Sequence, residues 1–115
     1  SNDIPVDDVD LCCLIVNMLD NAIRGAKAAE DDKIICIKIK EENGRIYISV
    51  SNYADMPDFE STEKLPSTKA NKNHGYGTEI IRNIVQKYDG DVLFTCKDRK
   101  FSTALSIRIK GKDQE

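Results

Sequence analysis

The sequence predicts an α+β fold, a two-layer sandwich in which helices cover one face of a β-sheet. Two segments repeat apolar residues at helical spacing, and four segments alternate apolar with polar residues. Their order is helix, hairpin, long loop, helix, hairpin. At 115 residues the chain has the length of one domain with one core. We therefore expect residues 1–115 to form a single domain.

The first helix is predicted from about Asp8 to Ala29. Its apolar residues recur at spacings of three and four, which places them on one side of the helix. These residues are Leu11, Leu14, Ile15, Met18, Ala22, Ala26 and Ala29. We expect this side to face the sheet.

A β-hairpin is predicted next, from Lys33 to Lys40 and from Arg45 to Ser51, with turn residues Asn43-Gly44 between them. From Asn52 to Asn73 the periodicity disappears, and prolines and polar residues take its place. A loop of this length in a compact domain is usually functional or mobile. We interpret it as a lid.

A second helix is predicted from Gly75 to Tyr88, where Asp89-Gly90 ends it. A second antiparallel hairpin is then predicted from Asp91–Cys96 and Phe101–Lys110, joined by a turn at residues 97–100. Its alternating apolar residues complete the expected core.

Composition excludes several classes of function. The net charge of −3 gives no basic field for nucleic acid, so we expect no nucleic acid partner. No apolar run reaches the roughly 20 residues that span a bilayer, and no signal-peptide pattern opens the chain, so we expect a soluble, cytosolic domain. The four cysteines lack zinc-site spacing, and we expect reduced thiols in the core.

The first helix also carries a polar stripe. Asn17, Asp20, Asn21 and Arg24 lie at i, i+3, i+4 and i+7, on one face beside the apolar one. Asparagine is unfavourable inside a helix, by roughly several tenths of a kcal/mol each. Amide and carboxylate oxygens suit Mg²⁺, which keeps several waters and takes further ligands from phosphates. These residues alone leave two interpretations open, a metal–nucleotide site and a solvated face.

A glycine-containing segment, Asn73-His74-Gly75-Tyr76-Gly77, opens the second helix. Glycines let a backbone approach phosphates, and the free N–H groups and dipole of a helix start favour an anion. The same glycines equally fit a simple turn into the helix.

Taken together, these segments resemble a known superfamily. The run Leu14–Arg24 closely resembles the N box of the GHKL ATPases and kinases, and Asn73–Gly77 occupies the place of their G2 box. The closing segment Ser102–Ile107 resembles the superfamily's terminal Gly-Thr-x-Phe-Thr-Ile strand. The residues Ser67-Thr68-Lys69, His74–Gly77 and Ile84–Gly90 are most similar to the peptide-pheromone (quorum-sensing) sensor histidine kinases.

The resemblance implies a Bergerat-type ATP-binding fold with a mixed sheet covered on one face by helices. It implies the catalytic domain of a two-component protein-histidine kinase, with ATP and Mg²⁺ as cofactors. The γ-phosphoryl group would pass to a histidine on a dimerisation and histidine-phosphotransfer domain of the same parent protein, so this fragment alone would not autophosphorylate. It further implies a response regulator as partner and a cytoplasmic location in a membrane-anchored bacterial receptor.

The resemblance also implies roles for individual residues. Asn21 would coordinate Mg²⁺, assisted by Asn17, and Arg24 would reach the phosphates. In the ATP-hydrolysing branch a glutamate at the position of Asn17 acts as general base; an amide cannot accept that proton, which favours a kinase. The remaining nucleotide contacts would come from the backbone at the helix start, the lid and the closing strand, at Gly75, Gly77, Lys69 and Thr103.

The G1 box, normally Asp-x-Gly-x-Gly, aligns only with Asn52–Met56, which has neither glycine. The amide oxygen of Asn52 would still accept a hydrogen bond from the adenine amino group, with Asp55 as an alternative contact. The charge-assisted bond of an aspartate is lost, so we expect weak adenine binding. Asn73 and Ser102 also replace family glycines.

Two alternatives remain within the superfamily. One is a degenerate, non-catalytic interaction module, which the altered G1 box favours. The other is a protein-serine kinase of the anti-sigma type, which would use nearly the same nucleotide site on a different partner. His74 does not resemble the acceptor histidine of the family, and an edge strand that usually precedes the first helix is expected to be missing.

Overall fold

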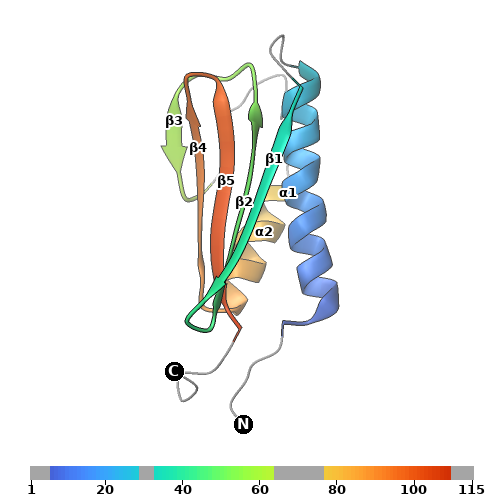
Figure 1. Ribbon diagram of the computed structural model, residues 1–115, viewed down its shortest axis with the longest axis vertical. Helices are drawn as coiled ribbons and strands as arrows, with labels where there is room; N and C mark the ends of the chain where they lie inside the picture. The colour runs from blue at the N-terminus through green and yellow to red at the C-terminus, as the bar shows by residue number, and fades with distance from the viewer. Residues whose placement is uncertain (1–5, 29–32, 64–76, 110–115) are drawn as a thin grey trace.

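The structure of this protein is a computed structural model that describes residues 6–28, 33–63 and 77–109. Along the chain, the elements are α1 (Asp8–Ala28), β1 (Ile35–Glu42), β2 (Arg45–Tyr53), β3 (Phe59–Ser61), α2 (Gly77–Lys87), β4 (Asp91–Lys97) and β5 (Lys100–Arg108). Both helices lie on the same side of the sheet (Figure 1). The predicted two-layer α+β sandwich is confirmed.

The sheet has the strand order β1-β2-β5-β4-β3, and its four described pairings are all antiparallel. The mixed sheet implied by the resemblance is therefore wrong for the described strands. The sequence pattern shows where strands lie. It does not show whether strands that are not consecutive in the chain pair in parallel or antiparallel directions. Here the chain leaves β3 and enters β4 at the same end of the sheet, so that pair is antiparallel too.

The predicted loop from Asn52 to Asn73 also needs correction. Asn52 and Tyr53 belong to β2, and β3 forms within the expected loop by pairing Phe59 with Cys96 and Ser61 with Phe94. A strand of three residues is too short to show alternation in the sequence. Its formation depends on contacts with distant residues, such as the stacked rings of Phe59 and Phe101, whose centroids are 6.3 Å apart.

Local hydrogen bonds and backbone conformations mark the ends of the elements. The Asp7 carboxylate caps α1 by accepting a hydrogen bond from the Val9 N–H at 2.8 Å. At the end of α2, Asp89 has a φ of 55° and the Gly90 N–H donates to the Val85 carbonyl at 2.9 Å. The turn at residues 97–100 is tighter than expected, because only Asp98 and Arg99, both with positive φ, lie outside the paired strands.

The core lies between the helices and the sheet. Leu14, Met18 and Ala22 of α1 pack toward the inner residues of β2, and Ile81 and Val85 of α2 complete the helical side. The sheet contributes buried residues from three strands: Ile48, Val50, Val92, Phe94, Cys96, Phe101, Leu105 and Ile107. Of the cysteines expected in the core, only Cys96 is buried, while Cys13 is partly buried and Cys12 and Cys36 are exposed.

The two helices are joined at one end by Asp10. Its carboxylate accepts hydrogen bonds from the Lys87 ammonium at 2.8 Å and the Tyr88 hydroxyl at 2.6 Å. These residues pair the beginning of α1 with the end of α2, so the helices run antiparallel and α2 begins beside the middle of α1 (Figure 1). Neither described helix combines the length and apolar character needed to cross a membrane.

Candidate functional site

The polar stripe of α1 contains one buried residue, Asn21. Its side chain lies on the inner edge of the helix and is only 6% exposed. Both polar atoms of its amide are buried and have no hydrogen-bond partner among the described residues. A buried amide in this state is costly, so Asn21 is the residue of the stripe that most needs an external partner.

The other residues of the stripe already have partners within the helix. The Asn17 amide nitrogen donates to the Cys13 carbonyl at 2.7 Å. The guanidinium of Arg24 lies 3.3 Å from the Asp20 carboxylate, and both side chains are about half exposed. An exposed i,i+4 ion pair contributes only about 0.3–0.5 kcal/mol, so Arg24 can exchange Asp20 for a stronger anion at small cost.

Asn52 occupies the end of β2, on the face of the sheet that the helices cover. Its side chain is 2% exposed, and its amide nitrogen donates to the Tyr53 carbonyl at 2.8 Å. The amide oxygen is buried without a partner among the described residues. Because the nitrogen is engaged, the free group at this position is a hydrogen-bond acceptor.

Thr103 provides a third buried polar group on the same face. It lies in β5 opposite Val50, two residues along the sheet from Asn52, and it is fully buried. Its hydroxyl also has no partner among the described residues. Diagonal neighbours of this kind are about 7–8 Å apart, so Thr103 lies near Asn52 on the same face of the sheet.

Gly25 brings α1 close to Asn52, and the sequence interpretation did not include it. A Cβ atom at Gly25 would lie 2.7 Å from the Asn52 amide nitrogen and 3.4 Å from the Ala54 Cβ. Asn21 lies one helical turn earlier on the same side of α1, so it faces the same interior region. The available signal was a glycine inside a long helix, which costs roughly 1 kcal/mol relative to alanine.

The remaining predicted site residues are divided among three places. Gly77 begins α2 and is half-buried. The antiparallel helix packing therefore brings the start of α2, with its free N–H groups, toward the polar stripe of α1. Asp55 is exposed after β2, whereas Asn52 is buried. Lys69 and Gly75 lie outside the described residues, as do Asn73 and His74.

The donor set fits a metal held mainly by phosphates. Among the described residues, no three His, Cys, Asp or Glu side chains come together as a metal site. The Asn21 oxygen is one buried, unpartnered ligand of the hard type that Mg²⁺ prefers. Mg²⁺ commonly uses one or two protein oxygens together with phosphates and water, so these residues fit an Mg–nucleotide complex.

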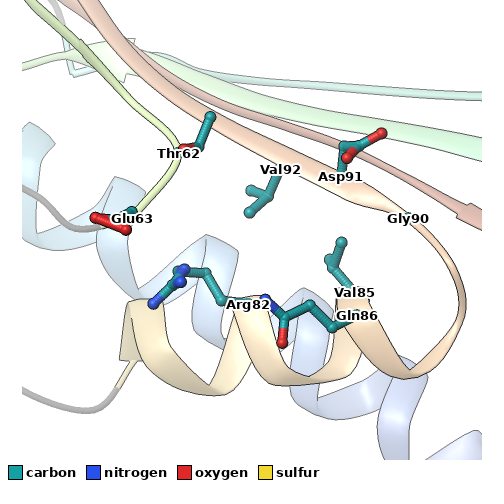
Figure 2. A pocket seen from close by; sticks show the side chains of 8 residues that line it. All are labelled: Thr62, Glu63, Arg82, Val85, Gln86, Gly90, Asp91 and Val92. Atoms are coloured by element: carbon teal, nitrogen blue, oxygen red, sulfur yellow. The ribbon is translucent and has the colours of Figure 1, made fainter.

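A separate hollow lies on the other side of α2. It has a volume of about 300 Å³ and opens between α2 and the edge of the sheet (Figure 2). It is lined by Thr62, Glu63, Arg82, Val85, Gln86, Gly90, Asp91 and Val92. None of the predicted nucleotide residues lines it, so the hollow is distinct from the candidate site at Asn21, Asn52 and Thr103.

Comparisons with known proteins agree with this architecture. A family model described as "GHKL domain" matches residues 6–109. No curated protein matches the chain. Among solved structures, the nucleotide-free catalytic domain of histidine kinase ThkA is 18% identical, with a TM-score of 0.66, over 92% of this chain and 70% of that one.

A second solved structure supports the same fold. The histidine kinase AdeS from Acinetobacter baumannii is 12% identical, with a TM-score of 0.64, over 91% of this chain and 48% of that chain. A further form of the ThkA catalytic domain has a TM-score of 0.61 at 17% identity. At these identities, the likeness to solved structures shows the fold of the chain.

Proposed function

The chain belongs to the GHKL family, and on that premise we propose that it is the catalytic domain of a histidine kinase, binding Mg·ATP between α1 and the start of α2. The observation that carries this proposal is the group of buried, unpartnered polar atoms on Asn21, Asn52 and Thr103. The family resemblance implies nucleotide contacts at all three residues. In the fold they face one interior region beneath α1.

The energetic cost of this arrangement supports a ligand. A buried polar group without a hydrogen bond costs about 1–3 kcal/mol, and a domain of this size is stable by only about 5–15 kcal/mol. Four such atoms on three predicted site residues are a large cost for a structural role alone. A bound nucleotide and its ordered waters satisfy them.

The proposed adenine contact is Asn52. Its free amide oxygen accepts a hydrogen bond from the exocyclic amino group of adenine, while the bond to the Tyr53 carbonyl holds the amide in that orientation. Thr103 lies two residues away on the neighbouring strand and supplies a hydroxyl that can donate or accept. Because Asn52 is neutral, we expect adenine to bind more weakly than it would to a carboxylate.

The proposed phosphate contacts come from the two helices. Asn21 presents its oxygen to Mg²⁺, with Asn17 assisting through the metal's waters, and Arg24 turns from Asp20 to the phosphates. Mg²⁺ neutralises phosphate charge during phosphoryl transfer. Gly77 contributes backbone N–H groups at the start of α2, and Gly75 and Lys69 are proposed to act beside it.

The proposed reaction is transfer of the γ-phosphoryl group rather than hydrolysis. Asn17 cannot accept a proton from water, and its amide nitrogen already donates to the Cys13 carbonyl. The acceptor is a histidine on a dimerisation and phosphotransfer domain of the parent protein, which passes the group to a response regulator. Likewise, we propose that the domain is the cytoplasmic part of a membrane-anchored peptide-pheromone receptor.

A second candidate is a GHKL module kept for interaction without catalysis. Ala54 and Met56 occupy the positions of the G1 glycines, and both side chains are buried in the core. In the family, glycines at these two positions let the backbone approach the nucleotide. Here packed side chains occupy that space. An intact fold without Mg·ATP binding would favour this candidate.

The test compares two asparagine substitutions in the same background. Asn21→Ala removes the proposed metal contact, and Asn83→Ala makes the same change at an exposed position of α2. We expect Asn21→Ala to weaken Mg-dependent ATP binding at least about tenfold, measured by calorimetry, because the metal loses a ligand. Asn83→Ala should bind as the unmodified chain does. Equal binding by both variants would refute the assignment of Asn21.

A further inference from the structure

The face of the sheet opposite the helices carries an unusual charge. Six basic and three acidic side chains of the strands alternate onto this open face: Lys38, Lys40, Arg45, Lys97, Lys100 and Arg108 against Glu42, Glu60 and Asp91. Lys40 already pairs with Glu42 and Arg108 with Asp89, and Asp98 of the β4–β5 turn lies on the same face. The whole chain has a net charge of −3. The open face is therefore basic on an acidic domain, an asymmetry that attracts an acidic partner.

The open face is also hollowed. A depression of about 550 Å³ crosses strands β1, β2, β5 and β4. Its floor consists of short hydroxyl side chains, Ser49, Ser51, Ser102 and Thr95, and longer side chains, including Lys38, Lys97, Lys100 and Tyr53, stand around it. Hydroxyl groups donate hydrogen bonds to anions, and the ammonium groups add charge.

The positive charge of this depression is only partly balanced nearby, by Asp98 in the turn and by Glu60, which pairs with Thr95. Lys97 and Lys100 are direct cross-strand partners, a like-charge arrangement that destabilises a sheet. None of Lys38, Lys97 and Lys100 has an ion-pair partner in the part of the chain that the structure describes. The one acidic residue lining the depression is Asp98, in the turn. An acidic partner would relieve this repulsion.

From these observations we propose that the open face binds an extended, acidic segment of a partner protein in the depression between Lys38 and Lys97. An extended chain matches a hollow that crosses four strands, and its carboxylates meet both the ammonium groups and the hydroxyl floor. A membrane is less well matched, because the floor is polar and recessed rather than apolar and protruding. Single-stranded nucleic acid is less well matched because aromatic stacking platforms are few.

The test uses a fluorescent decapeptide of alternating glutamate and serine, with binding measured by anisotropy on the complete chain. Lys97→Glu should weaken binding at least about fivefold, because it reverses a charge at the depression. Lys27→Glu is the matched control, since it makes the same change at an exposed position of α1. It should leave binding nearly unchanged.

A second variant tests whether binding depends on the shape of the depression or only on the positive charge of the face. Ser49→Tyr fills the floor without changing charge, and it should weaken binding by a similar factor. Vesicles containing phosphatidylserine serve as the competing surface. Peptide binding that is absent, that is unaffected by Lys97→Glu, or that falls equally with Lys27→Glu would overturn the proposal. So would unchanged binding by Ser49→Tyr, or tighter binding to the vesicles than to the peptide.

Discussion

At the scale of single residues, the site depends on how closely α1 approaches β2 at Gly25. Alanine at this position would favour the helix by roughly 1 kcal/mol. However, its Cβ would lie 2.7 Å from the amide nitrogen with which Asn52 holds the Tyr53 carbonyl. Overpacking of this kind costs about 1–3 kcal/mol, which equals or exceeds the gain in helix propensity.

We therefore predict that Gly25→Ala lowers the melting temperature and weakens ATP binding at least about tenfold, because Asn52 is displaced. Thermal unfolding and calorimetric titration measure the two effects. Asn83→Ala, at an exposed helical position, is the control and should not lower stability. A Gly25→Ala variant that is more stable and binds ATP normally would show that Asn52 tolerates displacement.

The sequence predicted which polar residues would form the proposed site, but it did not show that their burial and hydrogen bonding differ. Asn17 and Asn21 lie one helical turn apart in the same polar stripe. Of the two, only Asn21 is buried with polar atoms that have no partner among the described residues. Helical periodicity predicts the face of a residue only to within about one position. At the edge of a face, that difference decides whether a side chain is buried. Thr103 was indicated only by family resemblance, because a threonine in a strand is ordinary.

At the scale of elements, Asp10 fixes the end of α1 against α2. The hydrogen bonds from Lys87 and Tyr88 lower the pKa of Asp10, and the same bonds raise the pKa of Lys87 and of Tyr88. A lowered carboxyl pKa contributes stability above the ordinary value of 3.8. That contribution is lost as the pH falls through the lowered pKa of the folded state.

We predict that Asp10→Asn reduces the free energy of unfolding at pH 7. The difference from the unmodified chain should become smaller as the pH falls below about 4, because the Asp10 carboxylate is then protonated. Urea denaturation across this range, compared with the unmodified chain, measures the change. Asp8→Asn, at an exposed position in the same turn, is the control. A deficit that stays constant from neutral to acid pH would show that the Asp10 charge does not stabilise the helix pair.

The sequence predicted the two helices and four strands within a few residues because each is long enough to show its own period. The short β3 was missed, and the direction of the sheet pairings was misjudged. Both properties depend on partners far apart in the chain, such as Phe59 and Cys96. Local patterns carry little information about such pairs.

At the scale of the whole molecule, the helices cover the sheet unevenly. Ile39 of β1 and Ile48 of β2 are direct cross-strand partners facing the same side. Ile48 is 3% exposed beneath α1, whereas Ile39 is 59% exposed at the edge of the sheet. The sequence alternation could not show this difference, because both strands place aliphatic residues at alternate positions.

We predict that Ile48→Ala costs about 2–5 kcal/mol of unfolding free energy and that Ile39→Ala costs less than about 1 kcal/mol. Chemical denaturation of the two variants gives the comparison, and each serves as the control for the other. Similar costs for both would mean that the described helices do not determine which part of this face is buried.

The central claim is that this domain binds Mg·ATP through Asn21 and Asn52. The most direct measurement is calorimetric titration of the unmodified chain with a non-hydrolysable ATP analogue, up to millimolar concentrations, with and without Mg²⁺. We predict saturable binding that strengthens when Mg²⁺ is present and is lost when a guanine analogue replaces adenine. No binding at millimolar analogue with Mg²⁺, from a chain that circular dichroism shows to be folded, would contradict the claim.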